Sequence, residues 1–482
     1  MKFNAKLASL VVCLGLTSLL QIESLSVFIV ALIGYSFLLK LASLLNSITV
    51  KSLLYVSAIT ILPSLLYFYW VTKEGDWVTT VLRLDVSFQN SVFSISILFL
   101  YLFLIVIVSL VFESITNYGK SSLNFSTIKH VPIHVNNYLN ISIVKNDLLI
   151  IILIIASSLM RFYMFYAGIG IPGIAPPELP FRLTGILYTL NNIMIPAILS
   201  YYFVSSKKTL LLYFMYCLFI LIYSALSLSK ISLVITGFTI IFFAFRHERW
   251  LLGLFSSLIA LISFILINLG RTNYIIYMEN KFQPYLLPSR EPFQYSLVTD
   301  TFLNNDYNFW SILSSYLGQL LDASLGRLSN FISLLQSSRY DMRNVDGLNP
   351  IDVATKVFLH PFQSTINVDQ HHMEWQGYTL SAGQYHGGQL FSDSVFFNRF
   401  ELIPMLVLFS LTTFIFLYIV DYFLAKFKNK FNISYKSQSL LSYAFILLFV
   451  VDRGSSILLY SLILLILVTS KQFSFIKIRI KV

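Results

Sequence analysis

The chain has 482 residues, of which 57% are hydrophobic and only 11% are charged, whereas soluble domains carry about 25% charged residues. Too few charges remain to cover a large core with a hydrated surface, so the composition excludes a soluble enzyme and predicts an all-α polytopic membrane protein. The formal net charge of +11 is not taken to indicate a nucleic-acid partner, because membrane proteins retain Lys and Arg on the cytoplasmic side.

Taken in chain order, about twelve apolar runs predict transmembrane helices, each of which needs about 20 apolar residues. Lys2 and Lys6 precede the first run as in a signal peptide, but no small-x-small cleavage site follows, so we expect an uncleaved first span. The predicted spans are approximately 7–22, 25–39, 53–72, 91–112, 148–168, 183–204, 209–227, 231–245, 250–269, 402–420, 438–451 and 455–470.

The distribution of charge predicts the orientation of these spans. With the N-terminus inside, the inner segments hold 19 Lys and Arg residues against four acidic residues, Glu113, Asp147, Glu248 and Asp421. The basic clusters at 426–436 and 471–481 then lie on the inner side, as the positive-inside rule expects. We therefore predict that both termini are cytoplasmic.

One large hydrophilic region divides the chain into three predicted parts: a membrane bundle of about nine spans over 1–269, an outer loop over 270–399, and membrane hairpins of about three spans over 400–482. Within the loop, apolar residues at helical spacing over 307–338 predict an amphipathic helix on the bundle or at the interface. The stretch 344–393 is richer in Gly, His and Asp and is expected to be irregular. A loop this long is more often functional than a linker.

Six cations fall at the outer ends of predicted spans, where positive-inside sorting and the cost of burying charge both disfavour them. If they converged, they would form an anion site suited to phosphate or pyrophosphate. Alternatively, each cation snorkels to the headgroups or pairs locally, as Arg453 could with Asp452. The six are Arg161, Arg182, Lys230, Arg271, Arg399 and Arg453.

The stretch 369–399 offers candidate acid–base groups, and its aromatic rings could stack on sugars. The alternative is that these are ordinary solvated loop residues. No metal site is expected, because no HExxH motif is present. Phosphate-binding loops and the GxSxG elbow are also absent from the sequence, which disfavours ATP-driven transport and serine hydrolysis. The residues of interest are His371, His372, Glu374, Trp375, Tyr378, Tyr385, His386 and Asp393.

The layout of spans, late outer loop and outer-face cations resembles the bacterial O-antigen polymerases, the Wzy family. LSLSKISLVI is similar to the family's Ser-Arg-Gly-type turn, with Lys230 where arginine is usual. DRGSSILLYSLILL resembles its arginine-led last span, with Arg453 matching. GGQLFSDSVFFNRFELIPML resembles the glycine-rich segment before the span that follows the loop, although Glu401 and Leu402 stand where a glycine is expected; the loosely matching residues are Gly387, Gly388, Ser394 and Asn398.

This resemblance implies a glycosyltransferase of the bacterial inner membrane, with a periplasmic loop, that joins a growing glycan on undecaprenyl pyrophosphate to a lipid-linked repeat unit. The six cations would contact the pyrophosphate, and Trp375 and Tyr385 the glycan. His386 or Asp393, and after them Glu374, would act as the base. No cofactor is implied, since pyrophosphate is already a good leaving group. Membrane lipid and a chain-length regulator are the further candidate partners.

Two other functions stay open. An O-antigen ligase-like enzyme would use the same donor and transfer the glycan to lipid A-core. A secondary transporter or lipid flippase predicts ions near the bilayer midplane and broken helices in paired halves. Pro63 and Pro196, as well as Asn191 and Asn192, interrupt predicted spans, but charges in mid-membrane are missing from the sequence pattern.

Overall fold

The computed structural model describes residues 22–74, 88–122, 139–167, 169, 179–180, 183–205, 215–216, 218–220, 222–223, 258, 350–359, 402–433, 435–452 and 455–468. These residues are almost entirely helical, and no strand occurs among them. The elements are α2 (Ile22–Ala42), α3 (Ile48–Glu74), α5 (Phe88–Ser122), α6 (Leu139–Tyr166), α7 (Leu183–Thr189), the π-helical turn η2 (Leu190–Met194), α8 (Ile195–Ser205), α15 (Pro350–Leu359), α17 (Leu402–Phe431), α18 (Tyr435–Asp452) and α19 (Ser455–Val468).

The described membrane helices fall on the apolar runs of the sequence. Three helical stretches among the described residues are long and apolar enough to cross a membrane: Ile95–Thr116, Leu183–Tyr202 and Ile403–Phe431. Shorter apolar helices include Ile150–Tyr166 and Gln438–Val450. These helices support a helical membrane protein, while the number of about twelve spans stays a prediction. The predicted spans 7–22, 231–245 and 250–269 and the predicted amphipathic helix over 307–338 lie essentially outside the described residues.

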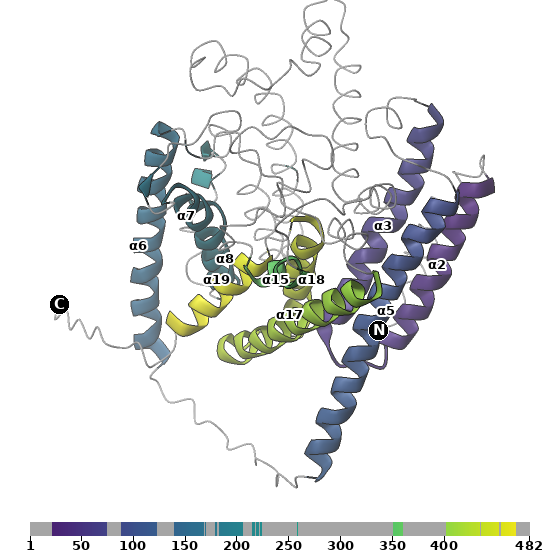
Figure 1. Cartoon of the computed structure of the whole chain (residues 1–482). Helices are drawn as coiled ribbons and strands as arrows, with labels where there is room; N and C mark the ends of the chain where they lie inside the picture. The colour runs from purple at the N-terminus through teal and green to yellow at the C-terminus, as the bar shows by residue number, and fades with distance from the viewer. Residues whose placement is uncertain are drawn as a thin grey trace, which may run out of the picture.

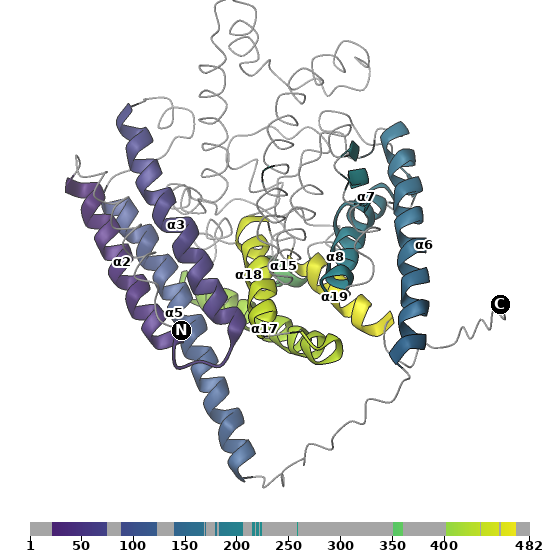
Figure 2. The same cartoon turned by 180° about the vertical axis from the view of Figure 1, so that it is seen from behind.

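The helices form two groups with a third between them. In both views α2, α3 and α5 stand together on one side, and α6, α7 and α8 on the other (Figures 1 and 2). The C-terminal helices α17, α18 and α19 lie between the groups, and α17 runs at a steep angle to α3 and α5. α18 packs on α3, α17 on α5, and α19 on α8 and η2. The last part of the chain therefore joins the two N-terminal groups.

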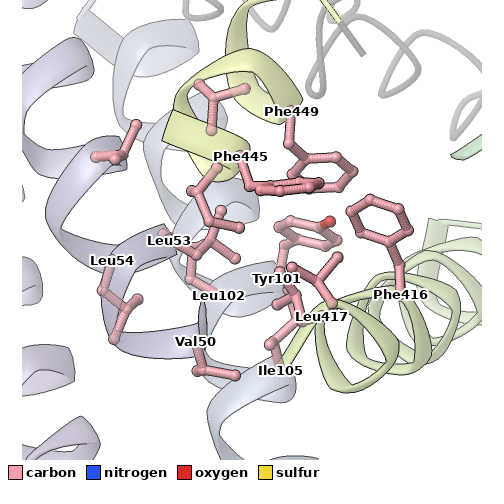
Figure 3. Packing of buried hydrophobic residues seen from close by; sticks show 14 of the residues in the cluster. Val50, Leu53, Leu54, Tyr101, Leu102, Ile105, Phe416, Leu417, Phe445 and Phe449 are labelled. Carbon is pink, nitrogen blue, oxygen red and sulfur yellow. The ribbon is translucent and has the colours of Figure 1, made fainter. Parts of the chain in front are cut away.

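One apolar core unites these helices. Figure 3 shows side chains of α3, α5, α17 and α18 meeting at its centre, where Phe416 stacks on Phe449 with ring centroids 5.1 Å apart. The hydroxyls of Tyr101 and Thr413 form a hydrogen bond of 2.6 Å within this core, between α5 and α17. α2 and α5 also approach each other closely at Gly34, because a Cβ at that position would lie 2.7 Å from the ring of Phe99. Dense packing of this kind is how helices associate where lipid removes the hydrophobic driving force.

Two carboxylates hold the turn between α2 and α3. Both oxygens of Glu113 on α5 accept from the backbone N–H of Asn46, at 3.0 and 2.8 Å, and one accepts from the N–H of Ser47 at 3.0 Å. Asp421 on α17 accepts from the hydroxyl of Ser47 at 2.5 Å and from the N–H of Thr49 at 3.2 Å. The first N–H groups of a helix lack partners within it and favour negative charge. Buried apolar packing and these capping contacts together fix α3 against α5 and α17.

The observed α17 also exceeds the predicted span, which ended at residue 420, and continues to Phe431. The hydropathy pattern places the end of the predicted span just before Asp421, because a charged residue is costly in lipid. The carboxylate is instead paired with Ser47 and Thr49, and the polar residues that follow include lysines, which are good helix formers. Helix propensity and tertiary contact therefore carry α17 past the apolar run.

The expectation of an irregular chain over 344–393 is wrong for one stretch, because Pro350–Leu359 forms the helix α15. Proline at the first helical position has its φ already set and lacks an N–H that would have no partner there. Ala354 and Phe358 lie one helical turn apart and pack into the core, where Phe358 contacts Phe416 at 5.8 Å between ring centroids. The hydroxyl of Tyr460 on α19 donates to the carbonyl of Phe358. Part of the predicted outer loop is thus docked on α17 and α19.

Removing this hydroxyl should loosen α15 without unfolding the protein. We expect Tyr460→Phe to raise the rate of amide hydrogen exchange in α15 roughly fivefold, because an internal hydrogen bond contributes about 1 kcal/mol. Hydrogen exchange resolved by mass spectrometry over 350–359 measures the change. Tyr443→Phe is the matched control, since that ring contacts Tyr55 on α3. Equal exchange in Tyr460→Phe and wild type would contradict a docking role for this contact.

Candidate functional site

The described candidate site begins on the inward face of α6. Ser157, Arg161 and Met164 follow one another at spacings of four and three residues, which places them on one helix face. All three are fully buried, with Arg161 0% exposed. On the opposite face, Leu159 and Phe162 are 66% and 63% exposed. α6 therefore turns its polar residues into the bundle and its apolar residues outward, the arrangement expected for ionisable residues within a membrane span.

A π-helical turn faces Arg161 and provides its hydrogen-bond acceptor. In η2 the N–H of Ile195 donates to the carbonyl of Leu190, five residues back. In the same register the next donor would serve the carbonyl of Asn191, but that position is Pro196, which has no N–H. Nη2 of Arg161 donates to this carbonyl at 2.5 Å. The guanidinium thus replaces the hydrogen bond that proline removes, and such π turns are often found at functional sites.

The side chain of Asn191 ties the same two elements together. Its Oδ1 accepts from the Ser157 hydroxyl at 2.6 Å, and its Nδ2 donates to Met164 Sδ at 3.4 Å. Asn191 is itself fully buried. These contacts fix η2 against α6, so the position of the carbonyl that meets Arg161 is set by three side chains rather than by the backbone alone.

Aromatic rings occupy another side of the guanidinium. The Cζ atom of Arg161 lies 4.7 Å from the centroid of the Tyr223 ring, and Tyr216 also lies beside the charged group. A cation over an aromatic face gains electrostatic attraction, which is larger when both groups are removed from water. The rings hold the guanidinium plane in place without neutralising its charge.

The charge of Arg161 has no carboxylate partner among the residues that the structure describes. Its Nε and Nη1 have no hydrogen-bond acceptor there either, although both atoms are buried. An arginine presents five N–H donors, and leaving a buried charge uncompensated is costly. The Nε–H and the Nη1–H groups point to different edges of the guanidinium, and phosphate or carboxylate oxygens that accept at these two edges would satisfy the group. We therefore consider Arg161 the centre of a candidate anion site.

Arg161 differs from one expectation drawn from the sequence. Snorkelling to the headgroups is wrong for this residue, because its side chain is 0% exposed and bonds to a backbone carbonyl of η2. The helix does not end at the arginine but continues to Tyr166, and the bundle encloses the side chain. The guanidinium is therefore held inside the bundle, as ionisable residues within spans commonly are.

The convergence of six cations stays a prediction, since five of them lie outside the described residues. The candidate catalytic and glycan-binding residues of the loop lie outside them as well. Where the structure does describe side chains, no three metal-ligating residues of the types His, Cys, Asp and Glu gather. The site residues outside the described part are Arg182, Lys230, Arg271, Arg399, Arg453, Glu374, Trp375, Tyr385, His386 and Asp393.

Several partners of Arg161 were not among the candidates from the sequence. In the sequence Asn191 marks only a break in a predicted span, and the local pattern does not distinguish Ser157, Tyr216 or Tyr223. Two signals were available: a serine one helical turn before Arg161, and an asparagine pair shortly before proline in an apolar run. Neither signal identifies which helices meet, so the contact itself required the tertiary structure.

Comparison with known protein families, with curated proteins and with solved structures found no match to this chain.

Proposed function

We propose that this chain is a glycosyltransferase of the bacterial inner membrane that polymerises undecaprenyl-pyrophosphate-linked repeat units into O-antigen or a related surface polysaccharide at the periplasmic face. The observation that carries the proposal is Arg161: a guanidinium buried among membrane helices, held on one side by Asn191, with Nε and Nη1 lacking an acceptor among the described residues. Such a group is suited to an anionic substrate that enters from the lipid.

The chemistry needs this kind of group. The hydroxyl of the acceptor sugar attacks the anomeric carbon of the donor glycan, and the bond from that carbon to the pyrophosphate oxygen breaks. Undecaprenyl pyrophosphate leaves with the bonding electrons, while the hydroxyl proton passes to a base, for which His386, Asp393 and Glu374 are the candidates. Negative charge grows on the leaving oxygen, and a preorganised cation in a water-poor site stabilises it more in the transition state than in the ground state.

A second candidate function is supported by a specific observation. Secondary transporters form their substrate sites at discontinuous helices, and ionisable residues inside spans mark substrate pathways. Arg161 beside η2 and Pro196 combines the two features. A flippase for the same lipid-linked oligosaccharide would use Arg161 to bind the pyrophosphate without breaking a bond. In contrast, α3 is one continuous helix through Pro63, so a paired break in that helix is not found.

Deletion of the gene in its host separates these functions. For a polymerase we expect the lipopolysaccharide ladder to collapse to core carrying one repeat unit, and plasmid-borne wild type to restore it. Complete loss of attached repeat units, with long lipid-linked glycan accumulating, would indicate a ligase instead. Loss of lipid-linked repeat units from the periplasmic face would indicate a flippase. An unchanged ladder and unchanged lipid-linked intermediates would refute all three.

A further inference from the structure

An exposed stripe along α17 changes from apolar to aromatic to cationic. Leu411 and Ile415 are 40% and 48% exposed, Tyr418 and Tyr422 are each 48% exposed, and Lys426 and Lys430 are also exposed. These residues follow one another at spacings of three and four, which keeps them on one helix face. From Leu411 to Lys426 the stripe covers about 22 Å at 1.5 Å per residue, close to half the thickness of a bilayer including headgroups. The order matches that of acyl chain, interface and headgroup.

The lysines at the end of this stripe are held in place. Nζ of Lys426 lies 4.6 Å from the centroid of the Tyr422 ring, and Nζ of Lys430 donates to the carbonyl of Ile466 on α19 at 2.9 Å. Asn432 adopts a left-handed conformation at φ 49°, and the N–H of Ile433 closes the helix end by bonding to the carbonyl of Lys428. This cap leads the chain into α18, where the Tyr435 ring meets Nζ of Lys428 at 5.5 Å.

Their charge is left for an external partner. Asp421 is the described carboxylate nearest to them in sequence, and it accepts from Ser47 and Thr49 on α3 instead. An ammonium group has three N–H donors, so Lys430 retains two after bonding to Ile466. Lysines just beyond the apolar part of a span are attracted to anionic lipid headgroups, and tyrosines favour the same interfacial depth.

We propose that this stripe binds one phospholipid with a net negative headgroup, with its acyl chain on Leu411 and Ile415 and its phosphate at Lys426 and Lys430. The phosphate would lie where α17 meets α19, because Lys430 belongs to α17 and its Nζ donates to the carbonyl of Ile466 on α19. This inference does not rest on the proposed glycosyltransferase activity, since it concerns a surface of α17 that contains none of the candidate site residues. Membrane lipid in general covers any apolar helix, whereas a lysine pair set at the end of such a stripe selects for charge.

Titration of the purified full-length protein with phosphatidylglycerol and with phosphatidylcholine, followed by native mass spectrometry, tests the proposal. We expect Lys426→Gln/Lys430→Gln to weaken phosphatidylglycerol binding about 25-fold, from about fivefold for each lysine, and to leave phosphatidylcholine binding unchanged. Lys426→Gln alone leaves the bond to α19 intact and should show about fivefold. Lys40→Gln is the control, because Lys40 is an exposed lysine in the last turn of α2.

Phosphatidylglycerol affinity that is unchanged in Lys426→Gln/Lys430→Gln and in Lys426→Gln would overturn the proposal, as would equal affinity of the wild type for the two lipids. Loss of binding in Lys40→Gln as large as in Lys426→Gln would also overturn it, because general charge rather than this stripe would then be responsible. Lys426→Arg/Lys430→Arg retains charge and should retain phosphatidylglycerol binding within about twofold, which separates headgroup attraction from damage to the helix pair.

Discussion

Replacing Arg161 by Gln is expected to reduce the rate of polysaccharide elongation about 100- to 1,000-fold, the effect of removing one preorganised donor from a developing negative charge. The glutamine side chain is two bonds shorter than arginine, so it loses the charge, the bond from Nη2 to the Asn191 carbonyl, and the donors Nε and Nη1. Elongation of a lipid-linked repeat unit by purified protein in detergent measures the change directly.

Two further variants separate catalysis from folding at this site. Arg161→Lys retains the charge but not the fork of donors, so it should recover only part of the rate. Ser157→Ala removes the hydrogen bond to Asn191 Oδ1 and leaves Arg161 in place, so we expect a loss of less than about fivefold. An Arg161→Gln protein that unfolds at the wild-type temperature and elongates glycan at more than half of the wild-type rate would exclude an anion-binding role in catalysis.

Replacing Glu113 by Ala should lower the free energy of unfolding by about 2 kcal/mol. The carboxylate accepts from two backbone N–H groups and from Nδ2 of Asn46, and hydrogen bonds to charged groups contribute about 1.5–3 kcal/mol when buried, less when partly exposed. Glu113→Gln retains one acceptor oxygen and should lose about half as much. Thermal unfolding in detergent micelles measures the order of the variants.

The neighbouring Ser114 offers a matched control. Its hydroxyl donates only to the carbonyl of Val111 on the same helix at 2.7 Å, so Ser114→Ala should change stability by less than about 0.5 kcal/mol. Because Glu113 and Asp421 hold the same turn, combining Glu113→Ala with Asp421→Ala should give a non-additive loss. A Glu113→Ala protein as stable as Ser114→Ala would show that the capping contacts of α3 do not contribute to stability.

The described contacts also connect the predicted outer loop to the candidate anion site. α15 packs on α19, and α19 packs on η2, which carries the acceptor for Arg161. The Tyr460 hydroxyl and the Phe358 carbonyl form the hydrogen bond at the first of these contacts. A substrate that moved α15 would therefore act on a helix that also touches η2, which relates the loop to the site through α19.

The sequence by itself determined the class of the protein and the place of its helices, because hydropathy over about 20 residues is a local property. The runs at 91–112 and 183–204 each lie on described helix. It also singled out Arg161, since a cation in an apolar run is unusual wherever the chain folds. Helix ends were less accurate, because polar residues such as Asp421 continue a helix when another helix satisfies them.

The tertiary structure decided which polar groups meet. Arg161 and Asn191 are 30 residues apart, and Ser47 and Asp421 are 374 residues apart; no local pattern encodes such a pairing. The helix α15, too, is set by its contacts, since ten residues rarely hold a helix in isolation and Ala354 and Phe358 gain a core to pack against. A buried polar group requires a partner, but only the packing of helices determines which partner is near, and for Arg161 that packing leaves Nε and Nη1 without an acceptor among the described residues.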